Sequence, residues 1–150
     1  MAIPSISPLA SSIATHAAAK VANVQPGLVG EATTRVSDSN VASAYGSGAI
    51  EVFATPAMIG LMEGAAARAV AAQLPEGSIT VGTRVDVRHL AATPLGGEVR
   101  ARAELVEVDG RRLVFHVEAF DATEKIGEGT HERAIVDHER LLGRARAKGQ

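Results

Sequence analysis

The sequence predicts an α+β fold in which one long buried helix lies against a curved antiparallel β-sheet. Between residues 55 and 74 the larger apolar residues recur with the period of a helix. Beyond residue 78 the period changes to two, because apolar and charged residues alternate along several successive segments. Tight turns such as "DGRR" (109–112) separate these segments, which favours antiparallel pairing between neighbours in the chain.

The segments before the helix differ in composition. Residues 1–26 are rich in Ala, Ser and Pro without a clear period, so we expect a flexible N-terminal extension. The folded domain is expected to span residues 27–143, and "LVGEATTRVSD" (28–38) has the composition of its first strand. The Gly- and Ser-rich stretch "NVASAYGSGAIE" (40–51) predicts a loop over the surface or over a site.

The helix that follows has no charged face. Thr55 stands before Pro56, which predicts an N-cap residue followed by a proline in the first helical position. One side of the helix carries the larger residues, which are Met58, Leu61, Met62, Ala65, Ala69 and Val70. The opposite side carries only small residues, which are Ala57, Gly60, Gly64, Ala67 and Ala71. A surface helix would place charges on that second side, so we expect protein to surround this helix before it ends at 75–77.

Four half-polar segments after the helix are typical of strands. They are "ITVGTRVDVRHLAATP", "GEVRARAELVEVDG", "LVFHVEAFDA" and "EKIGEGTHERAIVDHE". Residues 144–150 form a basic C-terminal tail that we expect to fray. One helix is too small to cover a sheet of this size, and long edge strands favour pairing with another chain. A homodimer is therefore expected, with a tetramer as a further possibility.

Composition and charge place the chain among ordinary globular proteins. Its 150 residues are 46% hydrophobic and 21% charged, which suits one domain with its own core. A net charge of −2 without an aromatic-laced basic patch gives no reason to expect nucleic acid. The absence of cysteine excludes disulfides, Cys-based metal sites and a thiol nucleophile. Without a signal peptide or a window of 18 apolar residues, we expect no membrane span and a reducing cytoplasm as the location.

Motifs for nucleotides and metals are incomplete. "YGSGAIE" (45–51) lacks the third glycine of a dinucleotide fingerprint and is not a G-x-S-x-G nucleophile motif. "HERAI" and "HERLL" begin like a zinc-binding helix, but neither supplies the second histidine. His131 and His138 are seven residues apart in a strand-like segment, which would point them to opposite faces. We therefore expect no metal and no resident cofactor.

Three residues are candidates for chemistry: Thr55, Glu63 and His89. Thr55 and Glu63 lie on the same helix, about 12 Å apart along its axis. His89 has the parity of Val81, Val85 and Val87, so we expect it to share their apolar face. A carboxylate and an imidazole on surfaces with a buried pattern are candidates for perturbed pKa values, and such residues gather at functional sites.

Structural roles explain the same residues equally well. Thr55 can serve only as an N-cap, Glu63 can reach solvent from the edge of its helix face, and His89 can be an ordinary, partly exposed histidine. His116 and His131 have the pattern of surface or sheet-face residues. Arg133 has the pattern of an exposed strand arginine.

Four segments, in order, resemble the hot dog thioesterases of the fluoroacetyl-CoA thioesterase type. They are "VFATPAMIGLMEGAAARA", "TVGTRVDVRHLAATPLG", "LVEVDGRRLVFHVEAFD" and "IGEGTHERAIVDHE", and the resemblance covers about residues 27–140. The family fold is a long helix wrapped by an antiparallel sheet and paired into a dimer, which agrees with the architecture expected from the pattern. The resemblance implies hydrolysis of acyl-CoA thioesters, in which CoA is part of the substrate.

The resemblance also implies roles for particular residues. The family's catalytic threonine, glutamate and histidine match Thr55, Glu63 and His89. Two further residues implicated near the substrate match Gly82 and Arg133, and Arg133 or the arginines of the tail could meet the CoA phosphates. Glu63 would activate water or attack the thioester directly, in a poorly solvated setting that raises its basicity. Thr55 would donate a hydrogen bond near the oxyanion, and His89 would position a partner or protonate the departing sulfur.

The sequence departs from the family before the helix. The phenylalanines that form a lid in the fluoroacetyl-CoA enzyme are replaced by Gly46 and Ala49, with only Tyr45 and Phe53 aromatic nearby. We therefore predict hydrolysis of a short or small acyl-CoA without strict fluoroacetyl specificity. Two alternatives stay open at this point: a hot dog hydratase or dehydratase acting on an enoyl thioester, and a non-catalytic dimer that binds acyl-CoA.

Overall fold

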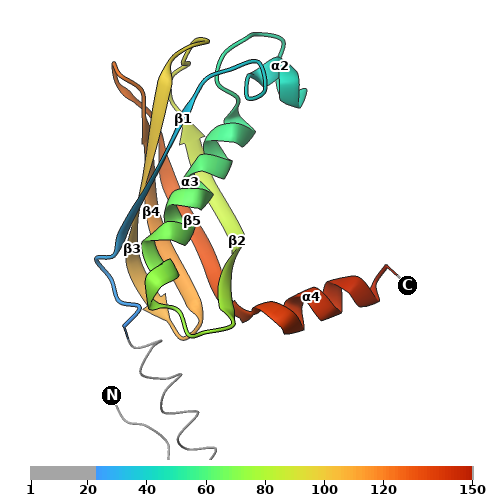
Figure 1. Cartoon of the computed structure of the whole chain (residues 1–150). Helices are drawn as coiled ribbons and strands as arrows, with labels where there is room; N and C mark the ends of the chain where they lie inside the picture. The colour runs from blue at the N-terminus through green and yellow to red at the C-terminus, as the bar shows by residue number, and fades with distance from the viewer. Residues whose placement is uncertain (1–22, 150) are drawn as a thin grey trace, which may run out of the picture.

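A computed structural model describes residues 23–149 as one curved antiparallel sheet wrapped around a helix (Figure 1). The elements are β1 (Val29–Arg35), α2 (Ala42–Tyr45), α3 (Thr55–Val70) with the 3-10 turn η1 (Ala71–Gln73), β2 (Ser78–His89), β3 (Glu98–Asp109), β4 (Arg112–Phe120), β5 (Lys125–Asp137) and α4 (His138–Ala147). The strand order is β1-β3-β4-β5-β2, so β1 and β2 form the two edges. The predicted fold class is confirmed. The predicted N-terminal extension lies outside the described residues up to residue 22, whereas Val24 is buried in the core.

The core forms where α3 crosses the sheet. Met58 and Met62 are buried on the inner side of the helix, which packs mainly against β1 and β3. Gly30 of β1 lies directly against the helix backbone, and a side chain there would overlap the carbonyl oxygen of Ala65. Only glycine allows this approach, which fixes α3 close to the β1 edge of the sheet. The β2 edge, at the other side of the sheet, is left with less cover.

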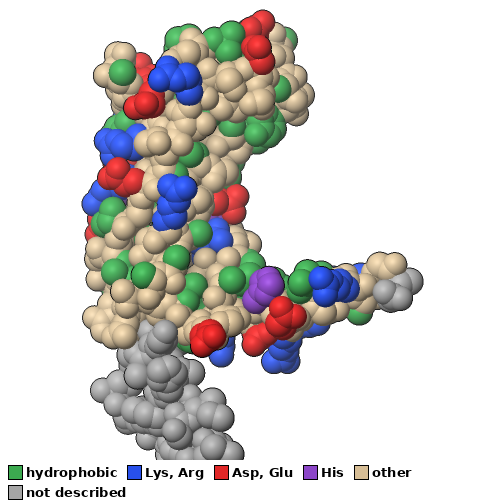
Figure 2. Space-filling model, in the orientation of Figure 1, with side chains coloured by type: hydrophobic (Ala, Val, Ile, Leu, Met, Phe, Trp, Pro, Cys, Tyr) green, Lys and Arg blue, Asp and Glu red, His purple; other side chains and the backbone are tan. Residues whose placement is uncertain are grey.

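The other side of α3 is open in the single chain, contrary to the expectation that protein would surround the helix. Gly60 is exposed, and no atom lies within 4 Å of where a side chain would begin at Gly60 or Gly64. The inner side of β2 near this open helix face carries Val85, which is 40% exposed. In Figure 2 the surface on this side is hollowed between the segment that contains α2 and the projecting helix α4, which Figure 1 labels in the same orientation. The small-residue face predicted from the sequence therefore faces this hollow.

A β-bulge divides strand β2. The register with β5 shifts between Gly82 and Arg84, so that Thr83 is an extra residue. As a result Val85 and His89 share their face with Gly82, as partners of inward-facing residues on β5. The prediction that His89 shares the face of Val85 and Val87 is correct. The prediction that Val81 shares it is wrong, because the extra residue at the bulge reverses the parity between Val81 and the residues after it.

Two further segments differ from expectation. The stretch 40–51 contains the short helix α2 and is held by a β-bridge between Val41 and Phe53. The last strand ends at Asp137, whose side chain accepts from the backbone N–H of Arg140 and caps α4. The prediction that the strand runs through residue 139 is therefore wrong. Helix α4 continues past residue 143, where the sequence placed the start of the tail, and projects away from the sheet (Figure 1). No described helix is long and apolar enough to cross a membrane.

Candidate active site

Thr55 and His89 meet where the start of α3 lies beside the end of β2. The hydroxyl oxygen Oγ1 of Thr55 is 2.8 Å from Nδ1 of His89. The N-cap of α3 is Ala54, Thr55 is the first helical residue, and no side chain caps the helix. The prediction that Thr55 is the N-cap is therefore wrong, and its hydroxyl contacts the imidazole instead of the helix backbone.

His89 is held as a partly buried imidazole. Burial lowers the pKa of His89 below its ordinary value, and the backbone of Ala91 opposes this shift. The second ring nitrogen, Nε2, is buried without a hydrogen-bond partner among the described residues. A neutral imidazole beside a hydroxyl can orient that hydroxyl and exchange a proton with a ligand.

A cavity of about 410 Å³ opens beside this pair. Its lining consists of Ala42, Ser47, Gly48, Ile50, Val52, Phe53, Thr55, His89, Leu90, Ala91 and Ala92. Tyr45 is 50% exposed and does not line it, while Phe53 lines it as a buried part of its wall. Most of the lining residues are small or apolar, and Thr55 and His89 form a polar end.

Glu63 lies in a second polar cluster near the middle of β2. Its Oε2 is 3.5 Å from Nη1 of Arg133, and a side chain at Gly82 would come within 2.6 Å of the same oxygen. Gly82 therefore leaves the space that the carboxylate occupies. The Glu63 side chain is 41% exposed in the single chain, so the expectation of a poorly solvated carboxylate is not met there.

Arg133 is buried, contrary to the alternative of an exposed strand arginine. It is 7% exposed, and burial lowers the pKa of its guanidinium while the charge of Glu63 opposes that shift. Nε donates to the hydroxyl of Thr80 and Nη2 to the Thr80 carbonyl, both at 2.9 Å. With these contacts made, the guanidinium faces α3 and not the solvent where a CoA phosphate would lie.

His131 is the residue of this cluster that sequence reasoning missed. It lies on the inner face of the sheet and is 1% exposed, so the prediction of a sheet-face residue holds and that of a surface residue is wrong. Its Nε2 lies 3.2 Å from Nη1 of Arg133. A signal was present in the sequence, because His131, Arg133 and Ile135 alternate along one strand. Since Ile135 points into the core, the parity of the strand predicts that the other two do as well.

The two clusters do not meet within one chain. Thr55 and Glu63 are eight residues apart on a continuous helix, so their backbones are about 12 Å apart. On β2, Gly82 and His89 are separated by about 20 Å. The structure thus joins Thr55 to His89, and Glu63 to Gly82 and Arg133, but it does not bring all three predicted catalytic residues together.

Comparisons with known proteins agree on one family. A family model described as fluoroacetyl-CoA-specific thioesterase matches residues 36–139. The fluoroacetyl-CoA thioesterase of Streptantibioticus cattleyicolor is 49% identical over 98 residues, which span 65% of this chain and 70% of that protein. The matched range includes both clusters, from Thr55 to Arg133.

Solved structures match over most of the chain. A structure of the fluoroacetyl-CoA thioesterase has a TM-score of 0.78 at 39% identity, covering 83% of this chain and 97% of that one. A threonine-to-serine mutant of it, in complex with acetyl-CoA, has a TM-score of 0.78 at 37% identity, covering 85% and 100%. A Thermus thermophilus hypothetical protein, a thioesterase superfamily member, has a TM-score of 0.77 at 26% identity, covering 84% and 93%.

Proposed function

The chain belongs to the fluoroacetyl-CoA-specific thioesterase family, and from this premise we propose that it hydrolyses acyl-CoA thioesters to a free acid and CoA. The observation that carries the proposal is the contact between Thr55 and His89 at the polar end of an apolar cavity. Release of free thiol from a series of acyl-CoA chain lengths tests it. Addition of water to an enoyl-CoA without thiol release would favour a hydratase, and binding without turnover would favour a non-catalytic dimer.

We propose that the Glu63 carboxylate takes a proton from water, whose oxygen attacks the thioester carbonyl carbon. Thr55 donates its hydroxyl proton to the developing oxyanion, beside the positive end of the α3 dipole. Its oxygen then accepts from Nδ1–H of His89, which fixes the direction of the hydroxyl. The carbon–sulfur bond breaks, and the proton held by Glu63 passes to the thiolate. Direct attack by Glu63 remains the alternative, with water then hydrolysing the mixed anhydride.

A homodimer would complete this site. Strand β2 is a free edge of the sheet, and it borders the hollow seen in Figure 2. If two copies pair antiparallel along β2 with the twofold axis at Asp86, the extra residue at Thr83 brings Gly82 of one copy opposite His89 of the other. Glu63 of one copy then faces the Thr55 and His89 of the second. This arrangement also covers the open face of α3.

The cavity supports a range of acyl groups. Its volume of about 410 Å³ corresponds to roughly a dozen water molecules, far more than a two-carbon acyl group displaces. Phe53 is the one aromatic residue in its lining, where it is buried in the wall, and Tyr45 does not line it. We therefore propose a substrate range that extends beyond fluoroacetyl-CoA.

The CoA phosphates require cations that Arg133 does not offer. A second cavity, of about 310 Å³, lies at the base of α4. Its charged lining residues are Arg111, Arg140 and Arg144 together with Asp137, whose carboxylate accepts from the backbone N–H of Arg140. None of these three arginines has a carboxylate within 4 Å among residues 23–149, whereas Arg84 and Arg112 are paired. Within one chain this cavity lies at the far end of β2 from His89, but the proposed dimer brings it beside the partner's site. We propose it as the phosphate subsite.

Removal of the positive charge of Arg140 and Arg144 should weaken the binding of CoA without affecting the rate of the chemical step. We expect Arg140→Ala combined with Arg144→Ala to raise KM for acyl-CoA roughly 10- to 100-fold, because two charge-assisted hydrogen bonds are lost. KM for an N-acetylcysteamine thioester of the same acyl group, which has no phosphate, should stay unchanged. Arg35→Ala, at the opposite edge of the sheet, is the matched control. An equal change with both substrates would contradict the assignment.

Thr55→Ala is expected to lower kcat by about 10²- to 10³-fold, which is the usual effect of losing one oxyanion donor. Because Ala54 and not Thr55 is the N-cap, the melting temperature should change little. Thr55→Ser, which keeps the hydroxyl, should retain most of the activity. Steady-state thiol release and thermal unfolding measure the two effects. A drop in melting temperature with normal kcat would assign Thr55 a structural role only.

A further inference from the structure

His131 connects the second cluster to the sheet through both of its ring nitrogens. Nδ1 is 2.8 Å from the carbonyl oxygen of Arg84, a group that can only accept, so Nδ1 carries the proton. Nε2 then carries the lone pair in the neutral ring, and it accepts from Nη1–H of Arg133 at 3.2 Å. The two contacts define a single tautomer of a side chain that is 1% exposed.

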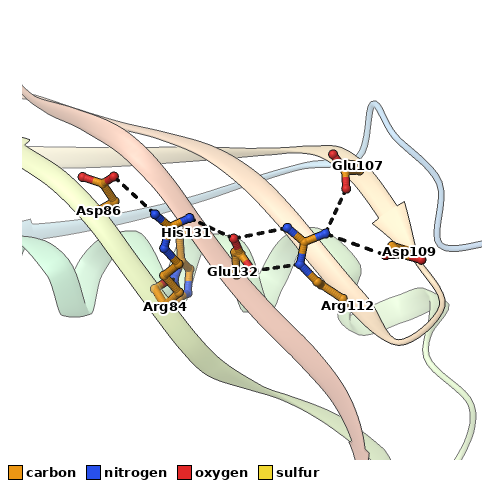
Figure 3. A network of polar contacts seen from close by, with 7 residues as sticks. All are labelled: Arg84, Asp86, Glu107, Asp109, Arg112, His131 and Glu132. Atoms are coloured by element: carbon orange, nitrogen blue, oxygen red, sulfur yellow. Dashed lines mark hydrogen bonds and ion pairs between the residues drawn. The ribbon is translucent and has the colours of Figure 1, made fainter.

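The carbonyl that holds His131 belongs to a residue whose side chain lies in a network of ion pairs. Arg84 follows the bulge in β2, and on the outer side of the sheet its guanidinium pairs with Glu132 at 3.2 Å and with Asp86 at 3.7 Å. Glu132 also accepts from Arg112 at 2.9 Å. Figure 3 shows this chain of ion pairs across the strands, with His131 beside Arg84. The network lies on the outer side of the sheet, behind the backbone from which the imidazole takes its orientation.

One guanidinium nitrogen lies between the imidazole and the carboxylate. Nη1 of Arg133 is 3.2 Å from His131 and 3.5 Å from Oε2 of Glu63, while the other two nitrogens bind Thr80. The contacts with Thr80 set the plane of the guanidinium, and Nε2 of His131 is the only hydrogen-bond acceptor that Nη1 meets in the described part of the chain. We infer that His131 is a positioning residue, which directs Arg133 toward Glu63 and so fixes the carboxylate for the proposed hydrolysis.

Protonation of His131 would turn its attractive contact with Arg133 into a repulsive one. An imidazolium has no lone pair for Arg133 and would place two cations 3.2 Å apart. Burial is the main cause that lowers the pKa of His131, with the charge of Arg133 acting in the same direction. The Arg84 carbonyl and the carboxylates of Glu63 and Glu132 oppose it. The neutral ring is therefore the form present at neutral pH, as the positioning role requires.

Two substitutions separate the two contacts of the ring. Asn at 131 places an amide N–H near the position of Nδ1, so it keeps the bond to Arg84 and loses the acceptor for Arg133. Gln reaches the position of Nε2 with its oxygen, so it keeps the acceptor and loses the bond to Arg84. We expect His131→Asn to lower kcat about tenfold with little change in KM, and His131→Gln to retain most of kcat. If His131 had a purely structural role, the loss of kcat in both variants would instead parallel the loss of thermal stability.

A double-mutant cycle tests whether His131 acts through Arg133. Arg133→Met removes the guanidinium while keeping an apolar stem, and in that background His131→Asn should lower kcat no further. An equal loss in both backgrounds, or a His131→Asn variant with wild-type kcat, would overturn the inference. If the variants do not fold, ¹⁵N shifts of His131 in the intact protein decide, because an Nε2–H tautomer or an imidazolium at pH 7 contradicts the role. The inference rests on the proposed function, whose own failure would appear as a wild-type protein that releases no thiol.

Discussion

Glu63→Gln is expected to abolish thiol release from acyl-CoA, lowering kcat by at least about 10³-fold. Glutamine has nearly the shape of glutamate but accepts no proton from water, so the loss is that of a general base or nucleophile. The fold should survive, because Glu63 is 41% exposed and Arg133 keeps its bonds to Thr80 and His131. Single-turnover thiol release and thermal unfolding measure the two properties.

The matched control is Glu31→Gln, which removes a carboxylate from β1 and should leave kcat unchanged. The assignment of Glu63 would be wrong if its glutamine variant released CoA at a near-normal rate. A variant that is inactive and also unfolded gives no support to a chemical role. The unfolding curve is therefore measured on the same samples.

Two inactive variants should restore each other when their subunits exchange. In a mixed dimer of Glu63→Gln and Thr55→Ala, one site receives intact Glu63 from one chain and intact Thr55 and His89 from the other. The second site carries both substitutions. Random exchange makes half of the dimers mixed with one complete site each, so we expect about a quarter of the wild-type activity. Thiol release before and after mixing measures this gain.

The reverse mixture is the control for this experiment. In a mixed dimer of the wild type and a chain carrying both substitutions, each site lacks either Glu63 or Thr55. Half of the wild-type chains enter such dimers when equal amounts are mixed, so the activity should fall to about half of that of the wild type alone. Mass spectrometry of differently tagged chains confirms that exchange has occurred. Mixed dimers without recovered activity would show that Glu63 and Thr55 do not act across the interface.

The sequence predicted the elements with strong periodicity and missed those set by single residues. The helix from Thr55 and the alternating strands followed from local pattern, and the structure confirms them. Helix α4 was missed because its N-cap, Asp137, looked like the continuation of a strand. The homodimer and the cytoplasmic location stay predictions.

The candidate site was predictable in part for a physical reason. Parity placed His89 on the inner face, and this holds because the segment from Val85 to His89 is regular. The contact between Thr55 and His89 depends on how the helix crosses the sheet, which no local pattern encodes. The buried role of His131 was encoded in strand parity, but a polar residue there favoured a surface interpretation.

The single extra residue at Thr83 decides which way Gly82 and His89 face on strand β2. Gly82 and His89 are seven positions apart, and an odd separation in a regular strand turns two residues to opposite sides. With Thr83 inserted, both face α3, one beside Glu63 and the other beside Thr55. Without it, either the carboxylate or the imidazole would lose its neighbour on β2. The extra residue therefore shifts the alternation of side chains, so that one edge strand faces α3 at both polar clusters.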